Sequence, residues 1–182
     1  MATPWNKKVK DSGKLSVYNG LTGKWSNTFQ IALPAFNDLT KASGLKIELV
    51  AETNELSANV LMNVGDGVVT FAGQSKTISG SVHGKTIHVS NDNENDQFTL
   101  IRAAIFLPGK ATEINQTVMT FIALHELVHA CGLDTNKDHA NDGIFMTLPN
   151  IQDNLLFSGD KTRKMPPWFF DPVTITMLQK LW

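Results

Sequence analysis

The stretch FIALHELVHACG (residues 121–132) contains two histidines four positions apart, His125 and His129, with Glu126 directly after the first. The residues around them are almost wholly apolar, which predicts a helix that is buried on most of its sides. With about 3.6 residues per turn, side chains four positions apart lie about 40° apart around the axis. Both imidazoles can therefore reach one metal ion, and Gly132 is typical of the residue that ends a helix.

Two histidines on one helix face, with a glutamate after the first, form a pattern typical of hydrolytic zinc sites. Zinc with three protein ligands keeps a fourth position for water and lowers the pKa of that water to about 7. Glu126 lies about 100° around the helix from His125, so we expect it to be the general base and not a ligand. The alternative is a chance occurrence of the pattern, but burying these three side chains without a purpose is costly.

A third zinc ligand must come from elsewhere in the chain. No glutamate follows Glu126, which excludes a downstream glutamate and leaves histidine or aspartate. His139 is the only histidine beyond the helix, and Asp134 is the alternative. Neutral imidazole suits zinc, which favours His139.

The pattern His125-Glu126-x-x-His129-x-x-Gly132 resembles the metzincin signature HExxHxxGxxH, and Met146 in GIFMT resembles the Met-turn of that family. The last residues, from Asp171, are similar to the closing helix of matrixin-like members. The family places its third histidine six residues after the second, whereas His139 follows His129 by ten. The short gap from His139 to Met146 is close to the family's spacing, so we expect four extra residues to bulge out before His139.

The resemblance implies a zinc-dependent endopeptidase with one catalytic Zn²⁺. It implies a single α+β domain over residues 1–182, metzincin-like, with a twisted mixed sheet of about five strands and three main helices. A cleft would separate a larger N-terminal subdomain (about residues 1–132) from a smaller C-terminal one (about 133–182). A protein or peptide substrate would lie extended along an edge strand, at residues 86–90 or, as second choice, 68–71. The pocket wall would come from residues 147–157.

The charge and composition of the chain limit the classes of partner molecule that we expect. The formal net charge is −1, with 42% hydrophobic and 18% charged residues, typical of a globular protein without a nucleic-acid or membrane-surface partner. We expect a monomer. The N-terminus lacks the apolar stretch of a signal peptide, although the resemblance favours secretion. One cysteine, Cys131, allows no internal disulfide, and we expect it to be a buried apolar group.

The remaining elements follow from periodicity and turn residues. Strands are predicted at residues 15–19, 46–51, 59–64 and 98–107, with an irregular edge hairpin over 65–97. Helices are predicted at residues 29–39, ending near Gly44, at 113–131 with Thr112 as N-cap and Glu113 in the first turn, and from Asp171-Pro172 onward.

Two further segments carry side chains that could bind a metal ion. His83 and His88 are expected to be surface groups, with a second structural metal as the alternative. Residues 91–96 (NDNEND) offer oxygen ligands for Ca²⁺ but lack the spacing of a known calcium loop, so a solvated turn is expected and calcium is unsupported.

Two other functions are alternatives to an endopeptidase. They are a catalytically silent zinc-stabilised peptide-binding module and a zinc hydrolase of small amides.

Overall fold

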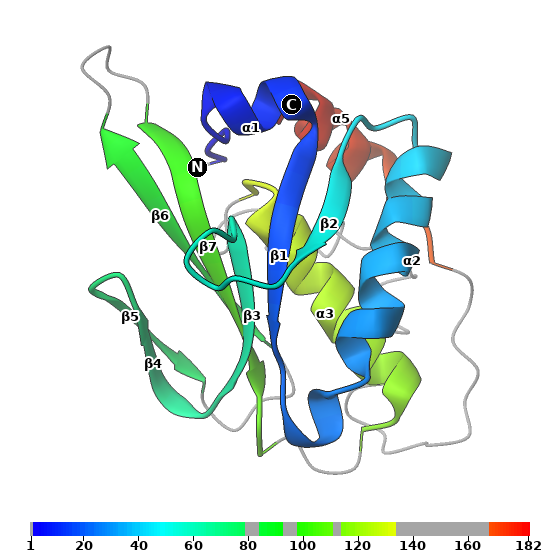
Figure 1. Cartoon of the computed structure of the whole chain (residues 1–182). Coiled ribbons are helices and arrows are strands. Elements are labelled where there is room, and N and C mark those ends of the chain that lie inside the picture. The colour runs from blue at the N-terminus through cyan, green and yellow to red at the C-terminus, as the bar shows by residue number, and fades with distance from the viewer. Residues whose placement is uncertain (1, 79–83, 93–97, 111–113, 134–167) are drawn as a thin grey trace.

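The computed structural model describes residues 2–78, 84–92, 98–110, 114–133 and 168–182, and its centre is a five-stranded mixed sheet (Figure 1). The strand order is β2-β1-β3-β7-β6. The first four strands run parallel, and β6 lies at the edge, antiparallel to β7. The strands are β1 (Lys14–Gly20), β2 (Glu48–Glu52), β3 (Val60–Gly65), β6 (Lys85–Asp92) and β7 (Phe98–Pro108).

Two long helices lie side by side against this sheet, α2 (Thr28–Ala42) near β2 and α3 (Gln116–Ala130) near β6 and β7 (Figure 1). Helix α2 buries Phe29, Ala32, Phe36 and Leu39, the helical spacing that predicted it. The last helix, α5 (Pro172–Leu181), begins where expected, because the Asp171 carboxylate accepts hydrogen bonds from the first two free N–H groups. The predicted α+β class, with five strands and three main helices, is confirmed.

The predicted edge hairpin over residues 65–97 proves to be two separate features. Strands β4 (Gly67–Phe71) and β5 (Gln74–Ile78) form their own two-stranded antiparallel sheet. The second β-prone piece, residues 86–90, belongs to β6 at the edge of the main sheet. The first choice of edge strand is therefore confirmed, and the hairpin is attached to it through a buried cluster of Val69, Ile78 and Ile87.

Some local structure at the N-terminal end is not predicted by the sequence. Helix α1 (Lys7–Ser12) occupies the lysine-rich segment near the N-terminus. Its only buried residue is Val9, so the chain carries no helical hydrophobic pattern there; the Asn6 side chain caps its start. A short 3₁₀ helix, η1 (Gly23–Trp25), precedes α2. In the described part of the chain, no helix has the length and apolar character needed to cross a membrane.

Candidate metal centre

Helix α3 carries the histidine pair and is the most deeply buried helix described. Twelve of its fifteen residues are buried, as the apolar flanks predicted. Its N-cap is Asn115, whose side-chain oxygen accepts a hydrogen bond from the Val118 N–H at 2.9 Å. The predicted N-cap, Thr112, was wrong, because the helix begins at Gln116, three residues after the predicted start at Glu113. Asparagine and threonine are both good N-caps, so the sequence offered two starts.

The two imidazoles meet edge to face. The Nε2 atoms of His125 and His129 are 3.1 Å apart, and the ring planes are inclined at 75°. Nδ1 of His129 lies 3.3 Å from the Leu133 carbonyl oxygen. Because a carbonyl can only accept, Nδ1 of His129 carries the proton and its Nε2 presents a lone pair toward His125.

This arrangement fits a tetrahedral zinc ion. Two Zn–N bonds of about 2.0–2.1 Å at a tetrahedral angle place their nitrogen atoms about 3.3 Å apart. The observed Nε2–Nε2 distance of 3.1 Å differs from that value by only a few tenths of an ångström. A histidine ligand usually donates its second ring N–H to a carbonyl or carboxylate, and His129 has such an acceptor in Leu133.

Glu126 points from α3 toward the edge strand β6. Its side chain is 4% exposed, and Thr86 Oγ1 donates a hydrogen bond to Oε2 at 2.6 Å. Burial raises the pKa of Glu126 to about 7, against the opposite effects of the Thr86 hydroxyl and the charges of Lys85 and Lys76. A Cβ at position 84 would collide with the glutamate side chain, so Gly84 leaves the space that Glu126 fills.

His88 corrects the prediction of a surface histidine. It lies in β6, half-buried, and its Nε2 donates to the backbone carbonyl of His129 at 2.7 Å. Burial lowers the pKa of His88 to about 4, so the ring is neutral at physiological pH. Its Nε2 donates to that carbonyl, which places His88 beside the last turn of α3 as a support.

The C-terminal end of α3 is held by segments from both ends of the chain. The indole N–H groups of Trp5 and Trp182 donate to the carbonyls of Ala130 and Cys131, at 2.9 and 3.0 Å. The Thr3 N–H donates to the Gly132 carbonyl at 2.8 Å. These donors satisfy carbonyls that a helix end leaves without intrahelical partners, and they fix the turn that carries His129.

Cys131 behaves as predicted. The thiol is fully buried within the main core cluster, and burial raises its pKa. It has the environment of a small apolar group.

Several predicted site residues lie outside the described residues. These are the third-ligand candidates His139 and Asp134, the Met-turn residue Met146, the wall residues 147–157, His83 and most of residues 91–96. Within the described ranges, no group of three or more histidine, cysteine, aspartate or glutamate side chains could hold a metal ion. The described part therefore contains two of the three predicted ligands, His125 and His129, and the metal site stays a prediction.

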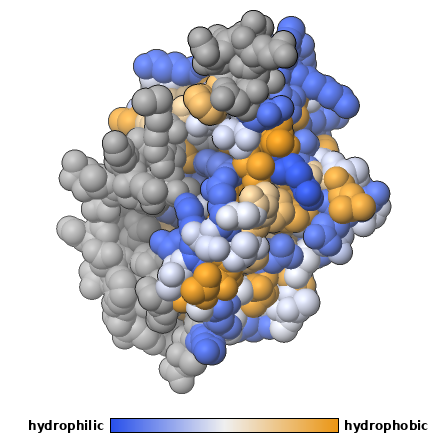
Figure 2. All heavy atoms as spheres, turned by 90° about the vertical axis from the view of Figure 1, so that its left-hand side faces the viewer, coloured by the Kyte–Doolittle hydropathy of each residue, from blue (hydrophilic) through white to orange (hydrophobic). Residues whose placement is uncertain are grey.

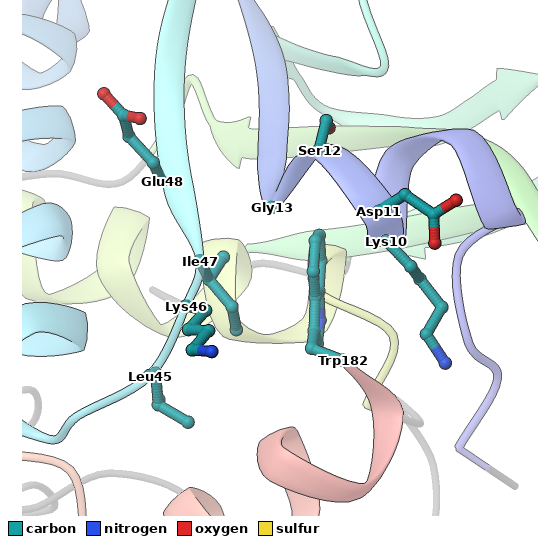
Figure 3. A pocket seen from close by; sticks show the side chains of 9 residues that line it. All are labelled: Lys10, Asp11, Ser12, Gly13, Leu45, Lys46, Ile47, Glu48 and Trp182. Atoms are coloured by element: carbon teal, nitrogen blue, oxygen red, sulfur yellow. The ribbon is translucent and has the colours of Figure 1, made fainter.

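A cavity of about 380 Å³ lies elsewhere on the molecule, between α1 and the segment before β2 (Figure 3). Trp182 forms part of its lining, together with Lys10, Asp11 and Lys46. It contains no residue of α3 or β6. Because none of its lining residues belongs to the histidine pair or to Glu126, we do not assign the proposed chemistry to it.

Comparison of the chain with protein-family models and with curated proteins finds no match. A function for this chain is therefore inferred from its own residues.

The sequence did not predict four residues that surround the site, which are Thr86, His88, Trp5 and Trp182. The alternation of residues 86–90 could have placed Thr86 and His88 on one face, but not against α3.

Proposed function

We propose that the chain is a zinc-dependent endopeptidase in which His125, His129 and His139 hold the ion and Glu126 is the general base. The observation that carries the proposal is the 3.1 Å approach of two Nε2 atoms on a buried helix, with Glu126 next in sequence to the first. Buried imidazoles that converge in this way have the donor set and spacing of a zinc site.

A bound zinc ion would polarise the scissile carbonyl and acidify the attacking water. Glu126 would accept a proton from that water and deliver it to the leaving amine. Thr86 orients the carboxylate for this role, since its hydroxyl occupies one carboxylate oxygen at 2.6 Å. The N–H donors from Trp5, Trp182 and His88 hold the last turn of α3, so the position of His129 does not depend on the helix alone.

The substrate would be an extended polypeptide, bound along β6. An edge strand offers backbone groups to an added strand, and β6 lies beside the helix that carries Glu126. This neighbourhood favours polypeptide over small amides, because a small amide needs no strand to align it. Neither a nucleic acid nor a membrane is part of the proposal, and the acting unit is the monomer.

The test is zinc content together with hydrolysis of casein, measured for the wild type and Glu126→Gln. We expect one zinc ion in both proteins and a loss of about 10²–10⁴-fold in hydrolysis for Glu126→Gln, the usual worth of a general base. An unchanged low rate in both proteins, with zinc present, would instead support the silent binding module. Hydrolysis of small amides but not of casein would support the amidase.

The third ligand is tested with the same two measurements. We expect His139→Ala to lose zinc and activity and Asp134→Ala to keep most of each, with His125→Ala as the positive control for ligand loss. The reverse result for positions 139 and 134 would transfer the ligand role to the aspartate.

A further inference from the structure

Two side chains of strand β5 are bonded to the backbone of the edge strand β6. Lys76 Nζ donates to the Thr86 carbonyl at 2.8 Å, and Gln74 Nε2 donates to the His88 carbonyl at 2.8 Å. Strands β5 and β6 belong to different sheets, so these contacts replace the backbone pairing that a neighbouring strand would make.

Both carbonyls lie on the outer edge of β6. The register pairs His88 with Ala103 of β7, and Ala103 gives its N–H to the Asn59 carbonyl, away from β6. The His88–Ala103 pair is therefore a non-hydrogen-bonded pair, in which the backbone groups of both residues face away from each other. Thr86, two positions earlier, has the same orientation as His88. An added strand would need these same two carbonyls.

We propose that Gln74 and Lys76 compete with the substrate for the outer edge of β6, so that these two residues set the affinity for an extended polypeptide. The inference rests on the proposed function in that it takes this edge as the substrate-binding strand. A substrate would replace the two side-chain donors with two of its own backbone N–H groups.

The spacing of the donors allows this exchange. N–H groups two residues apart on an extended chain point the same way and are separated by about 6.6–6.8 Å, the same repeat as the carbonyls of Thr86 and His88. At the two carbonyls, two hydrogen bonds are lost and two are gained, so the exchange is balanced in number there. The substrate must still overcome the two existing bonds, which lowers its apparent affinity.

Among the described residues, only these two side chains have to move. The hairpin is attached to the sheet through Val69 and Ile78, which pack on Ile87. Side chains alternate along a strand, and those of Thr86 and His88 contact α3, so Ile87 faces the opposite side of the sheet. Gln74 is exposed and Lys76 is half-buried, so both polar ends can return to water. Burial lowers the pKa of Lys76, which shows that its ammonium is partly desolvated where it now lies.

Figure 2 shows the side of the molecule to which the hairpin belongs, where apolar and hydrophilic residues are intermixed around the described strands. On the hairpin itself, Val68 is 69% exposed. A polypeptide that reaches β6 from this side meets both polar donors and apolar contact area. The hairpin thus forms one rim of the proposed binding edge while its two donors occupy that edge.

The test uses Gln74→Met with Lys76→Met, which removes both donors while keeping side-chain length. Binding of fluorescein-labelled casein is measured by anisotropy on zinc-loaded Glu126→Gln protein, with and without the double substitution. We expect binding about tenfold tighter with it, a change of about 1.4 kcal/mol. In the hydrolytic background, KM should fall by the same factor.

Two control variants separate competition from other effects. Thr70→Ala removes the exposed Thr70–Ser75 contact within the hairpin and should leave casein affinity unchanged. Lys76→Arg keeps a positive charge and an N–H donor at this position and should also bind like the parent. If Lys76→Arg tightens binding as much as Lys76→Met, competition by the donor is contradicted.

The outcomes distinguish this inference from the proposed function. Casein hydrolysis with unchanged or weaker binding by the double variant would overturn the inference and leave the endopeptidase standing. Tighter casein binding without hydrolysis by the wild type would do the opposite. No measurable binding by either parent or double variant would overturn the inference as well.

Discussion

At the scale of single residues, Thr86 connects the edge strand to the proposed base. Its side chain is 1% exposed, and its hydroxyl lies 2.6 Å from Glu126 Oε2 and 3.2 Å from the Glu126 carbonyl oxygen. The shorter contact is a hydrogen bond to a carboxylate in a buried setting, the stronger kind of hydrogen bond. Thr86 therefore fixes the direction of the carboxylate without touching the proposed metal.

We predict that Thr86→Val lowers kcat about 10-fold to 100-fold, because the hydroxyl that orients the Glu126 carboxylate is lost. Valine has the same shape as threonine, so the packing at this position is kept. Zinc content and KM should stay within about twofold, since neither the histidine pair nor the backbone of β6 changes. Thr86→Ser restores the hydroxyl and should recover most of kcat. Equal loss in the serine and valine variants would show that packing, and not the hydrogen bond, is what matters at this position.

The sequence located the histidine pair but not its supports, for a physical reason. His125 and His129 converge because helical geometry dictates it, and Glu126 is fixed beside them by the chain itself. Thr86 and His88 reach α3 only through the packing of β6 across the helix, a contact over about 40 positions that no local pattern encodes. His88 was consequently misjudged as a surface group.

At the scale of elements, the end of α3 depends on one glycine. Gly132 has φ of +112°, and a Cβ there would collide with the Thr3 carbonyl oxygen. The same glycine accepts the Thr3 N–H and gives its own N–H to the His129 carbonyl. Gly44 after α2 also has positive φ, +68°, but a Cβ there would meet no atom within 4 Å.

These two glycines make a matched pair for a stability prediction. Gly44→Ala should cost about 1–2 kcal/mol of unfolding free energy, the backbone strain alone. Gly132→Ala should cost more than about 3 kcal/mol, because strain is joined by the collision and a displaced N-terminal segment. Urea unfolding followed by circular dichroism measures both. Equal losses would mean that the Thr3 contact contributes nothing to the end of α3.

The elements themselves were largely predictable, with errors where the signal is local and weak. Helix α2, strand β7 and helix α5 have strong periodicity or good caps, and the structure has them as predicted. The start of α3 was placed early because two residues suited to capping lie close together. Helix α1 was missed because it is only six residues long.

At the scale of the whole molecule, the layering brings distant segments to one helix end. Trp5 is 125 residues from Ala130 and Trp182 is 51 residues from Cys131, yet both indoles cap α3. The α+β class could be predicted because each layer has its own hydrophobic pattern. The meeting of both ends of the chain at α3 could not, because tryptophan in an isolated sequence shows only that it prefers burial. Its hydrogen-bond partner is decided by the completed fold.

Zinc binding should therefore stabilise the fold as a unit and not only α3. An ion that binds only the folded chain raises the unfolding free energy by RT ln(1 + [L]/Kd), about 4 kcal/mol at a free concentration 1,000 times Kd. For a chain of this size that corresponds to roughly 10 °C in Tm. We expect this difference between zinc-loaded and chelator-treated wild type in thermal unfolding.

Gly44→Ala should show the same rise in Tm with zinc from a lower Tm without it, because this substitution lies away from the proposed ligands. His125→Ala should show almost no rise. An identical Tm with and without zinc in the wild type would contradict metal binding at the histidine pair, since both ligands lie on a helix that the unfolded chain does not preserve.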